Sequence, residues 1–491
     1  MLKSNNPYFS FKKILLIKPN YHVNNADIHF VHINLPPLSL TFIASYLVDL
    51  DVEIEILDAK VKNLSYKQIR KKIKKINPDI VGITVFISAS INVCYDIAKI
   101  VKDINQNTMV VFGGRHFTSE YEEALNVDEV DIIVRGEGEL TFRELILKET
   151  PENVKGISYK SNGKIINNPD RELIEDFENI RYPARQFTKN NKYKMLTVRI
   201  ETVETSRGCP YRCKFCITPN FNKGLWRPRP FEKIITELKL ISQNRKITDI
   251  LFVDDNLTVK TKRIEKLCER IIECKKNKEI NDFRFIAQVR ADSIVKAPHM
   301  VKKMAEAGFW IVFIGIESVH EKILKDMRKG VVFNTVLKAL QILHEYNIIV
   351  FGNMIIGLDL NATEDDIRKE IKFIKKVDVD LISFTLLTPF PGTDTLKELE
   401  KKNLVITKDW SKYTLVNPVI KTYQLSPKKI QELLYYSFKE NNFFNNLIRF
   451  TSRIIKIRGF LFIQNPRRFI FWVKSYIKLR ILIRKFFLGT K

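Results

Sequence analysis

Short apolar runs alternate with segments of helical periodicity along most of the chain, and they form two series. In the first series the apolar runs are KILLIKP, VEIEILDA, DIVGITVF, MVVFGG and DIIVRGEGE, with helical patterns in LSLTFIASYLVDL and INVCYDIAKIVKDI. Strands that alternate with helices predict an α/β domain with a doubly wound parallel sheet of flavodoxin-like type. Ligands of such sheets bind beyond the carboxyl ends of the strands.

The second series begins at about residue 198 and contains six apolar runs: VRIETVET, DILFVDD, RFIAQVR, WIVFIGIES, IVFGNMIIG and LISFTLLTP. Six strands are too few for a closed eight-stranded barrel. The series therefore predicts a partial (β/α)6 barrel of TIM type, with active-site residues at the carboxyl ends of its strands. We expect a first domain at 1–150, a connector at 151–197, the barrel at 198–420 and a basic helical tail at 421–491.

Composition places the chain among intracellular globular proteins. Of its 491 residues 45% are hydrophobic, and its six cysteines are too few for a disulfide framework, so a reducing cytoplasm fits best. The segment ILLI near the start is too short for a signal peptide. The uncharged run at 28–48 contains Pro36 and Pro37, which a spanning helix does not tolerate well.

Positive charge is concentrated at the end of the chain. The net charge is +26, and residues 441–491 contain twelve Lys or Arg and no Asp or Glu. Two amphipathic, aromatic helices separated by Pro466 suit peripheral association with the inner face of an anionic membrane. The alternative is a helical cap that packs on the barrel with a solvated basic face. No RNA-binding module is recognised, so nucleic acid is not an expected partner.

The segment TSRGCPYRCKFC places Cys209, Cys213 and Cys216 directly after the first barrel strand, with the spacing C-x3-C-x2-C. Structural zinc requires four ligands, usually from two C-x2-C pairs. The other cysteines lie in two predicted helices and offer no evident fourth thiolate: Cys94, Cys268 and Cys274. A [4Fe-4S] cluster in which one iron is left for a non-protein ligand explains why the motif contains only three cysteines.

This spacing, with Phe215 before the last cysteine, resembles the radical S-adenosylmethionine superfamily. The resemblance implies that the open iron binds the amino and carboxylate groups of S-adenosylmethionine. It also implies that the reduced cluster cleaves this molecule to methionine and a 5′-deoxyadenosyl radical.

The resemblance continues at the ends of the following barrel strands. It implies contacts to the methionine amino group from FVDDN, to the carboxylate from QVRAD and to the ribose from GIES: Asp254, Asp255, Asn256, Arg290, Glu317 and Ser318. An arginine suits a carboxylate because guanidinium binds it bidentately. The segment GNMIIGLDLNAT resembles the part beside adenine, although the family's Pro-Gly-Glu is replaced by Asp-Leu-Asn-Ala. A hydrogen bond that stabilises the barrel is the alternative for each residue.

The first domain together with the barrel resembles the cobalamin-binding radical S-adenosylmethionine class, which includes hopanoid-modifying enzymes and an anaerobic chlorophyll-ring cyclase. The matching segments are LPPLSLTFIASYL, PDIVGITVF, VVFGGRHFT, VDIIVRGEGEL and FENIRYPAR, so the resemblance covers about residues 10 to 420. We expect cobalamin to lie against the loops that follow the strands, where glycines expose bare backbone: Pro19, Asn20, Phe86, Ser88, Gly113, Gly114, Arg115, Gly136 and Glu137.

A cobalt ligand is not assigned. Other cobalamin proteins carry D-x-H-x-x-G, and the segment DIHFVH supplies Asp27 and His29 without the glycine, so chance spacing is the preferred explanation. A cobalamin fold that no longer binds its cofactor is an open alternative.

The resemblance implies hydrogen abstraction from an unactivated carbon, methylation of that carbon by methylcobalamin, and regeneration of the cofactor by a second S-adenosylmethionine. The expected partners are a lipid or other hydrophobic substrate and an electron donor such as flavodoxin or ferredoxin. Cyclisation or rearrangement without methyl transfer is one alternative, and a non-catalytic cobalamin or redox sensor on membranes is another. RNA methylthiolation needs three further cysteines in the leading domain, which has only Cys94.

Overall fold

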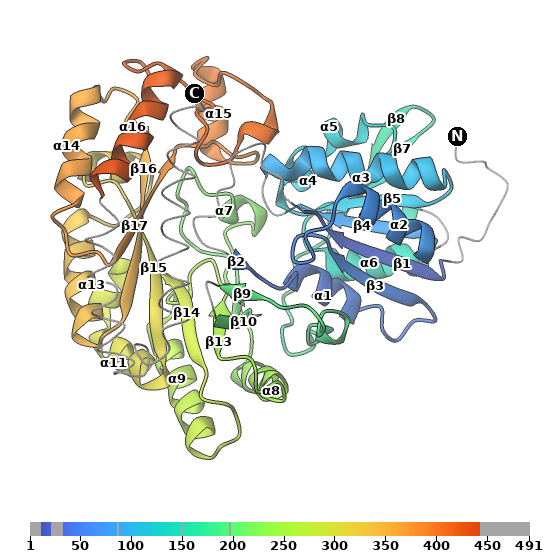
Figure 1. Ribbon diagram of the computed structural model, residues 1–491, viewed down its shortest axis with the longest axis horizontal. Helices are drawn as coiled ribbons and strands as arrows, with labels where there is room; N and C mark the ends of the chain where they lie inside the picture. The colour runs from blue at the N-terminus through green and yellow to red at the C-terminus, as the bar shows by residue number, and fades with distance from the viewer. Residues whose placement is uncertain (1–10, 21–32, 86–87, 149–150, 196–197, 442–491) are drawn as a thin grey trace.

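The computed structural model describes residues 11–20, 33–85, 88–148, 151–195 and 198–441. These residues form two sheets, each with its own helices, and loops from both sheets meet between them (Figure 1). Phe86, the DIHFVH segment and the basic tail from residue 442 onward lie outside the described residues.

The first sheet has seven strands in the order β3-β1-β4-β5-β6-β7-β8. The first five of these are parallel, and β7 and β8 are antiparallel additions at one edge. Taken along the chain, the parallel strands have the flavodoxin-like order 2-1-3-4-5, which confirms the predicted doubly wound sheet. The strands are β1 (Lys13–Lys18), β3 (Glu53–Asp58), β4 (Ile80–Thr84), β5 (Met109–Gly113), β6 (Ile132–Val134), β7 (Ile157–Ser161) and β8 (Lys164–Asn167).

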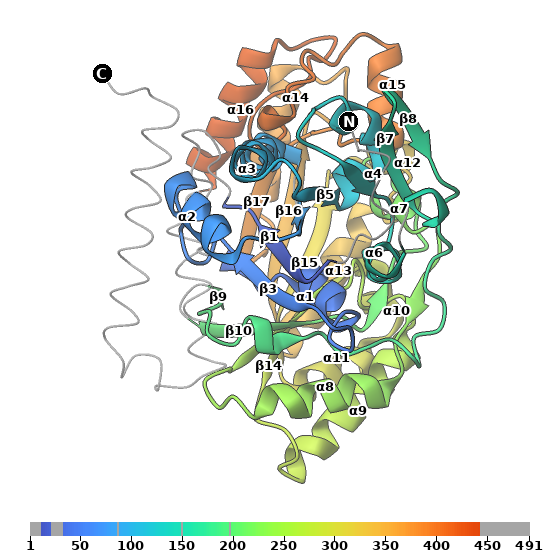
Figure 2. The same cartoon turned by 90° about the vertical axis from the view of Figure 1, so that its right-hand side faces the viewer.

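Helices cover both faces of this sheet (Figure 2). Along β1, Leu15 and Ile17 pack in the hydrophobic core shared with α2 and α3, while Ile14 and Leu16 pack in the core shared with α1 and α6. Burial on both faces explains why this strand is apolar at successive positions. The helices are α1 (Leu38–Ser45), α2 (Tyr66–Ile76), α3 (Ile91–Ile104), α4 (Arg115–Ser119), α5 (Tyr121–Leu125) and α6 (Gly138–Leu147).

The second sheet has eight strands in the order β17-β16-β15-β14-β13-β10-β9-β2. Six of them are parallel and form the predicted partial barrel: β10 (Val198–Val203), β13 (Asp249–Phe252), β14 (Arg284–Val289), β15 (Phe309–Glu317), β16 (Ile349–Ile356) and β17 (Leu381–Leu386). The short strands β9 (Lys194–Met195) and β2 (Ile33–Asn34) extend its edge in antiparallel pairing. A segment of the first domain thus completes the barrel sheet.

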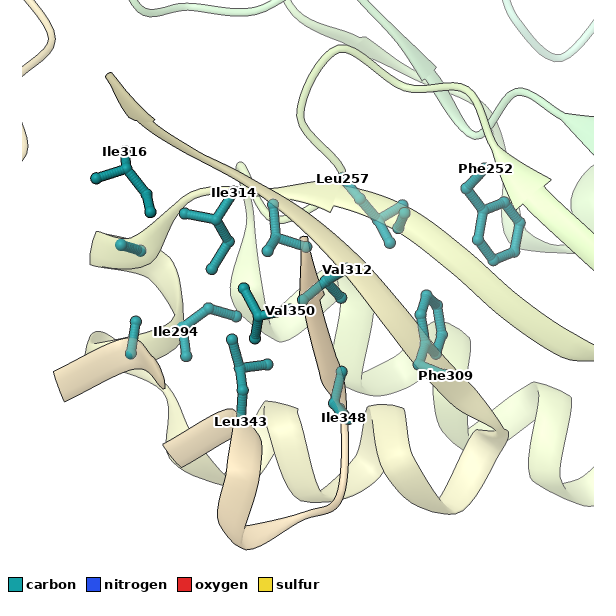
Figure 3. Close-up of a cluster of buried hydrophobic side chains, with 14 of the residues drawn as sticks. Phe252, Leu257, Ile294, Phe309, Val312, Ile314, Ile316, Leu343, Ile348 and Val350 are labelled. Carbon is teal, nitrogen blue, oxygen red and sulfur yellow. The ribbon is translucent and has the colours of Figure 1, made fainter. Parts of the chain in front are cut away.

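The outer face of the barrel sheet packs against its helices (Figure 3). Phe252, Val312 and Val350 point outward into one large hydrophobic core, and the Phe252 and Phe285 rings stack with centroids 5.2 Å apart. The helices are α8 (Phe231–Ser242), α9 (Thr261–Lys276), α10 (Ala291–Lys296), α11 (Pro298–Ala307), α12 (Glu321–Asp326), α13 (Phe333–Glu345), α14 (Glu364–Ile374) and α16 (Pro427–Glu440). Among the described residues, no helix is both long enough and apolar enough to span a bilayer.

After the last barrel strand the chain returns to the first domain. Helix α15 (Asp394–Lys401) and the residues up to Ile420 place Leu396, Trp410 and Tyr413 in the core that contains Leu15 of β1. The Trp410 indole Nε1 also donates to both carboxylate oxygens of Glu123, at 3.0 and 2.8 Å. The two sheets are therefore joined by shared apolar packing as well as by their loops.

Candidate active site

The three cysteines of the predicted cluster lie on one loop, residues 208–217, which we call the cysteine loop. Its first residue, Gly208, has φ +85°, and a Cβ there would lie 2.1 Å from the Leu225 carbonyl oxygen, so only glycine fits. The Cys216 amide donates to the Cys213 carbonyl at 3.1 Å, and the Lys214 amide donates to the Met327 carbonyl at 3.1 Å. The loop is thereby fixed to the segment that follows α12.

The thiols of the cysteine loop are free and half-buried, and cations lie near them. Burial raises the pKa of Cys209 to about 11 and also raises that of Cys213, while the charges of Lys329 and Arg290 lower the pKa of Cys213. Among the described residues, no three His, Cys, Asp or Glu side chains are arranged to hold a metal ion, so the thiols must converge to bind one. Three thiols on one loop beside two cations nevertheless fit an iron–sulfur cluster, because the cations offset the charge of the thiolates.

The remaining cysteines are buried in α3 and α9. Within the described part of the chain they offer no fourth ligand beside the cysteine loop, which agrees with a cluster that has one open iron.

Arg290 supports the cysteine loop from the end of β14. Its guanidinium lies 3.4 Å from the centroid of the Tyr211 ring, donates to the Asp292 carboxylate at 3.1 and 3.2 Å, and donates to the Lys329 carbonyl at 3.0 Å. The structure therefore places Arg290 beside the predicted cluster, with part of its hydrogen-bonding capacity already used by the protein.

Glu317, at the end of β15, belongs to a polar network on the inner face of the barrel. Lys329 Nζ lies 2.7 Å from Glu317 Oε1, the Asn353 amide donates to Oε2 at 3.3 Å, and Ser383 donates to Asn353 Oδ1 at 2.8 Å. Lys329 also lies over the Phe215 ring, 6.0 Å from its centroid. Sequence reasoning found Glu317 and Phe215 but missed Lys329 and Asn353, because nothing in the sequence marks which of 82 basic residues meets a given carboxylate.

Two predicted contacts of S-adenosylmethionine are satisfied by the protein itself. The buried Asp254 carboxylate accepts from the Thr205 amide at 3.0 Å and from the Thr205 and Ser206 hydroxyls, which holds the turn after β10. Ser318 donates to Glu370 of α14 at 2.6 Å. These bonds match the stabilising alternative considered for each residue.

Asn256 differs from these two residues. Its Oδ1 accepts from the amide and the hydroxyl of Thr258, both at 3.1 Å, while its Nδ2 is buried without a hydrogen-bond partner among the described residues. A buried unpaired donor is costly, so this amide is positioned to bind an acceptor group of a ligand.

Arg115 connects the two sheets. It follows the Gly113-Gly114 turn after β5 and donates to Asp255 at the end of β13, at 3.1 and 3.4 Å, and to Thr218 at 3.1 Å. Thr218 begins α7 (Thr218–Phe221), two residues after Cys216, and itself donates to Asp255 at 2.8 Å. Residues predicted for two different cofactors thus form one hydrogen-bonded group between the sheets.

Glu137 also faces the barrel rather than open space. Its carboxylate accepts from Arg207 at 3.0 Å, from Arg227 at 2.9 Å on each oxygen, and from the Ile174 amide at 2.7 Å. Arg207 further pairs with Glu139 at 2.7 Å. Arg207 directly precedes Gly208, so this buried ion cluster anchors the start of the cysteine loop. Arg207 and Arg227 belong to the short strands β11 (Ser206–Arg207) and β12 (Arg227–Pro228), which pair with each other in antiparallel fashion.

The other residues predicted for cobalamin lie along the carboxyl edge of the first sheet. Pro19 and Asn20 are buried, and Asn20 donates to Asn63 at 3.2 Å. Gly113 ends β5, and Gly114 has φ +109° with the Val85 carbonyl 2.7 Å from where a Cβ would lie. These residues shape the edge mainly through tight backbone packing.

Ser88 and Gly136 offer different surfaces at this edge. Ser88 is buried against His116, with 3.0 Å between Ser88 Oγ and His116 Nδ1, and burial lowers the pKa of His116 to about 4. Gly136 has φ +74°, and no heavy atom of the other described residues lies within 4 Å of where a Cβ would lie. Bare backbone beside open space fits the approach of a large ligand, so this edge is compatible with cobalamin.

The inner face of the barrel sheet is only partly filled. Ile286, Ile311 and Ile349 are buried there, whereas Phe313 and Phe351 remain half-buried with ring centroids 5.2 Å apart. Farther along the same face are polar side chains that are half-buried or exposed: Gln288, Asn353 and Ser383. The face therefore presents aromatic surface beside a polar rim.

Two regions of the chain match known protein families. Residues 28–146 match the B12 binding domain, and residues 203–374 match the radical SAM superfamily. An uncharacterised methyltransferase of Pyrococcus horikoshii is 37% identical over 437 residues, which cover 87% of this chain and 92% of the relative. An anaerobic magnesium-protoporphyrin IX monomethyl ester cyclase of Rubrivivax gelatinosus is 28% identical over 83% of this chain and 73% of its own length.

A solved structure shares the two-domain fold. The radical S-adenosylmethionine methyltransferase TsrM from Kitasatospora setae, with cobalamin and a [4Fe-4S] cluster bound, superposes with a TM-score of 0.68. The identity is 16%, and the superposition covers 86% of this chain and 85% of TsrM. The arrangement of the two sheets is thus that of a known fold.

Proposed function

The chain belongs to the cobalamin-binding radical S-adenosylmethionine enzymes, and from that premise we propose that it methylates an unactivated carbon of a hydrophobic substrate. When bound, the reduced cluster and S-adenosylmethionine supply a radical that removes a hydrogen atom, and methylcobalamin supplies the methyl group. The observation that carries the proposal is that Arg115, at the carboxyl edge of the first sheet, bonds to Asp255 at the end of β13 and to Thr218, two residues after Cys216.

The cysteine loop would hold the cluster through Cys209, Cys213 and Cys216. Arg290 and Lys329 would offset the negative charge of the thiolates, since both cations act on the Cys213 thiol. The unpaired amide of Asn256 is available to bind an acceptor group of S-adenosylmethionine.

Cobalamin would lie at the carboxyl edge of the first sheet. In a sheet of order 2-1-3-4-5, ligands bind where the strand order reverses, which here is between β1 and β4. Asn20 and Ser88 follow these two strands, and Gly136 provides open backbone farther along the same edge.

The hydrophobic substrate is inferred from the inner face of the barrel. Half-buried Phe313 and Phe351 would bind apolar groups, while Asn353 and Glu317 would contact polar ones or the nucleoside. The relative from Rubrivivax carries the name of an enzyme for a porphyrin ester, which is a large hydrophobic molecule. An electron donor such as flavodoxin or ferredoxin would reduce the cluster.

The proposal is tested by anaerobic reconstitution of Cys216→Ala. We expect the variant to form no 5′-deoxyadenosine from S-adenosylmethionine and to retain cobalamin binding, because Cys216 lies in the barrel half of the site. Cys268→Ala is the matched control, since it removes a thiol buried in α9 away from the cysteine loop. Zinc without iron or sulfide in the anaerobically purified protein would contradict the proposal.

Cyclisation or rearrangement is the second candidate reaction, because a relative at 28% identity is named as a cyclase. Mass spectrometry of the product made with S-adenosylmethionine carrying a labelled methyl group distinguishes the two, since only methylation retains the label. The non-catalytic sensor is not retained, because the chain belongs to a family of enzymes.

A further inference from the structure

Helix α2 presents a cationic surface that the proposed reaction does not use. Between residues 60 and 78 the chain contains eight Lys or Arg and no Asp or Glu. The helix is well defined at both ends: Ser65 and Gln68 form a capping box, and Asn77 adopts the left-handed conformation just after its last turn.

The cations of α2 form a stripe that faces away from the protein. Ile69 and Ile73 are buried in the core of the first domain, while Lys67, Lys71 and Lys74 recur at helical spacing on the opposite side and are exposed. Among the described residues none of these three lysines forms an ion pair. The basic residue of the helix that does form one is Arg70, which pairs with Asp103 of α3 at 2.7 Å.

Helix α9 shows what an ordinary solvated surface looks like in the same protein. Its exposed Lys262 and Lys266 alternate with Glu265 and Glu269, so opposite charges lie within one turn of each other. Helix α2 contains no Asp or Glu to offset the repulsion among its basic side chains. This repulsion is unfavourable in the isolated protein. Such a surface is stabilised by a partner of opposite charge.

We propose that the lysine stripe of α2 docks the protein on the anionic surface of a lipid bilayer. Lysines are point charges on long flexible stems, so they suit a diffuse negative surface better than a directional site. Residues 441–491 contain twelve further Lys or Arg and no Asp or Glu, so the sequence carries a second cationic, acid-free segment. Among the described elements, helix α2 lies at one edge of the first domain (Figure 2).

The test uses the full-length protein and does not depend on the proposed reaction. We expect binding to phosphatidylcholine vesicles that contain phosphatidylglycerol, little binding without it, and release at high salt because salt screens surface charge. Each lysine near an anionic membrane strengthens binding by a factor of roughly five, so neutralising Lys67, Lys71 and Lys74 to Gln together weakens it roughly 100-fold. Far-UV circular dichroism checks that the variant is folded.

The matched control changes Lys262, Lys266 and Lys276 of α9 to Gln, which removes the same total charge. We expect it to bind vesicles nearly as well as the wild type. If both variants lose vesicle binding equally, binding depends on net charge alone. If the α2 variant loses no vesicle binding, other segments are responsible. Either result overturns the proposal. Slower reduction by an acidic flavodoxin with unchanged vesicle binding would assign the stripe to the electron donor and overturn it as well.

Discussion

Gly315 lies where a methyl group would collide with the ion pair that lines the inner face of the barrel. A Cβ at this position would be 1.9 Å from Glu317 Oε1 and 2.6 Å from Lys329 Nζ. We expect Gly315→Ala to displace the flexible ends of this pair, to change the free energy of unfolding little, and to reduce formation of 5′-deoxyadenosine. Gly163→Ala in the β7–β8 turn is the control for activity: its φ of +75° strains an alanine, so it loses stability, but no described residue lies within 4 Å of its Cβ position and 5′-deoxyadenosine formation should not change. Normal activity of the Gly315 variant would contradict a role for the pair.

Glu137 is the carboxylate on which the buried ion cluster depends. Its side chain is 7% exposed and accepts bonds from both Arg207 and Arg227. Removing one partner of a buried pair costs about 3–5 kcal/mol, so we expect Glu137→Gln to lower the unfolding free energy by an amount of this order. We also expect less iron per chain after reconstitution, because Arg207 holds the start of the cysteine loop.

A surface pair provides the comparison for Glu137. Glu172 pairs with Lys155 at 3.0 Å, and both side chains are more than half exposed. We expect Glu172→Gln to leave the unfolding free energy and the iron content nearly unchanged, because an exposed ion pair adds little stability. Equal iron contents in the two variants would show that the ion cluster is not needed to position the loop.

The sequence could predict which residues lie at the ends of strands. It could not predict which of these residues form hydrogen bonds or ion pairs with other residues of the protein. Cys209, Cys213 and Cys216 follow directly from their spacing and lie on one loop as expected. Asp254 and Glu137 also lie at strand ends, yet their partners are 37 to 90 residues away along the chain. Such pairings depend on how two sheets face each other, which no local pattern encodes.

At the scale of elements, the apolar pattern predicted both parallel sheets because each strand is long enough to show its run of buried residues. It did not predict the two-residue strands β2 and β9, since two residues carry no periodicity. It also missed α2, whose core contribution is small, although the capping box of Ser65 and Gln68 was a readable signal. The return of α15 and Trp410 to the first domain had no local signal, because its packing is determined by distant strands.

The packing of this returning segment near Glu120, which lies between α4 and α5, is expected to depend on pH. Burial, with a smaller effect from Glu123, raises the pKa of Glu120 to about 7, against about 4.5 in the unfolded chain. A carboxyl group whose pKa is raised in the folded state stabilises the fold less as pH rises. Here this stabilisation is lost between about pH 4.5 and 7. We therefore expect Glu120→Gln to raise the Tm relative to the wild type at pH 8 but not at pH 4.5. An equal Tm difference at both pH values would contradict this assignment.

At the scale of the whole molecule, two sheets that bind ligands at their carboxyl edges face each other and are joined at several places among the described residues. The joins include the Arg115–Asp255 group, the Glu137 ion cluster, the apolar core that contains Trp410 and the pairing of β2 with β9. Because the Arg115 and Glu137 joins lie on loops that follow the strands, we expect a change at one site to affect the other through these short, partly buried links. The boundaries at 150, 197 and 420 remain a prediction, and separating the domains at these points is expected to expose these joins.

Arg115 is the join at which this coupling is best measured. Its side chain is 41% exposed, so its loss should change the unfolding free energy by less than about 1 kcal/mol. It nevertheless links the Gly113-Gly114 turn to Asp255 and Thr218 beside the cysteine loop. We therefore expect bound cobalamin to strengthen S-adenosylmethionine binding in the wild type by about 5-fold or more, which is within the usual range of coupling between sites. The coupling is the ratio of the S-adenosylmethionine dissociation constants measured without and with cobalamin. In Arg115→Gln we expect this ratio to fall towards one, while each cofactor still binds on its own. Arg328→Gln, which breaks an exposed pair with Asp394 at 2.9 Å, should keep the wild-type ratio. A ratio that survives the loss of Arg115 would show that the sheets communicate through the ion cluster or the shared core instead.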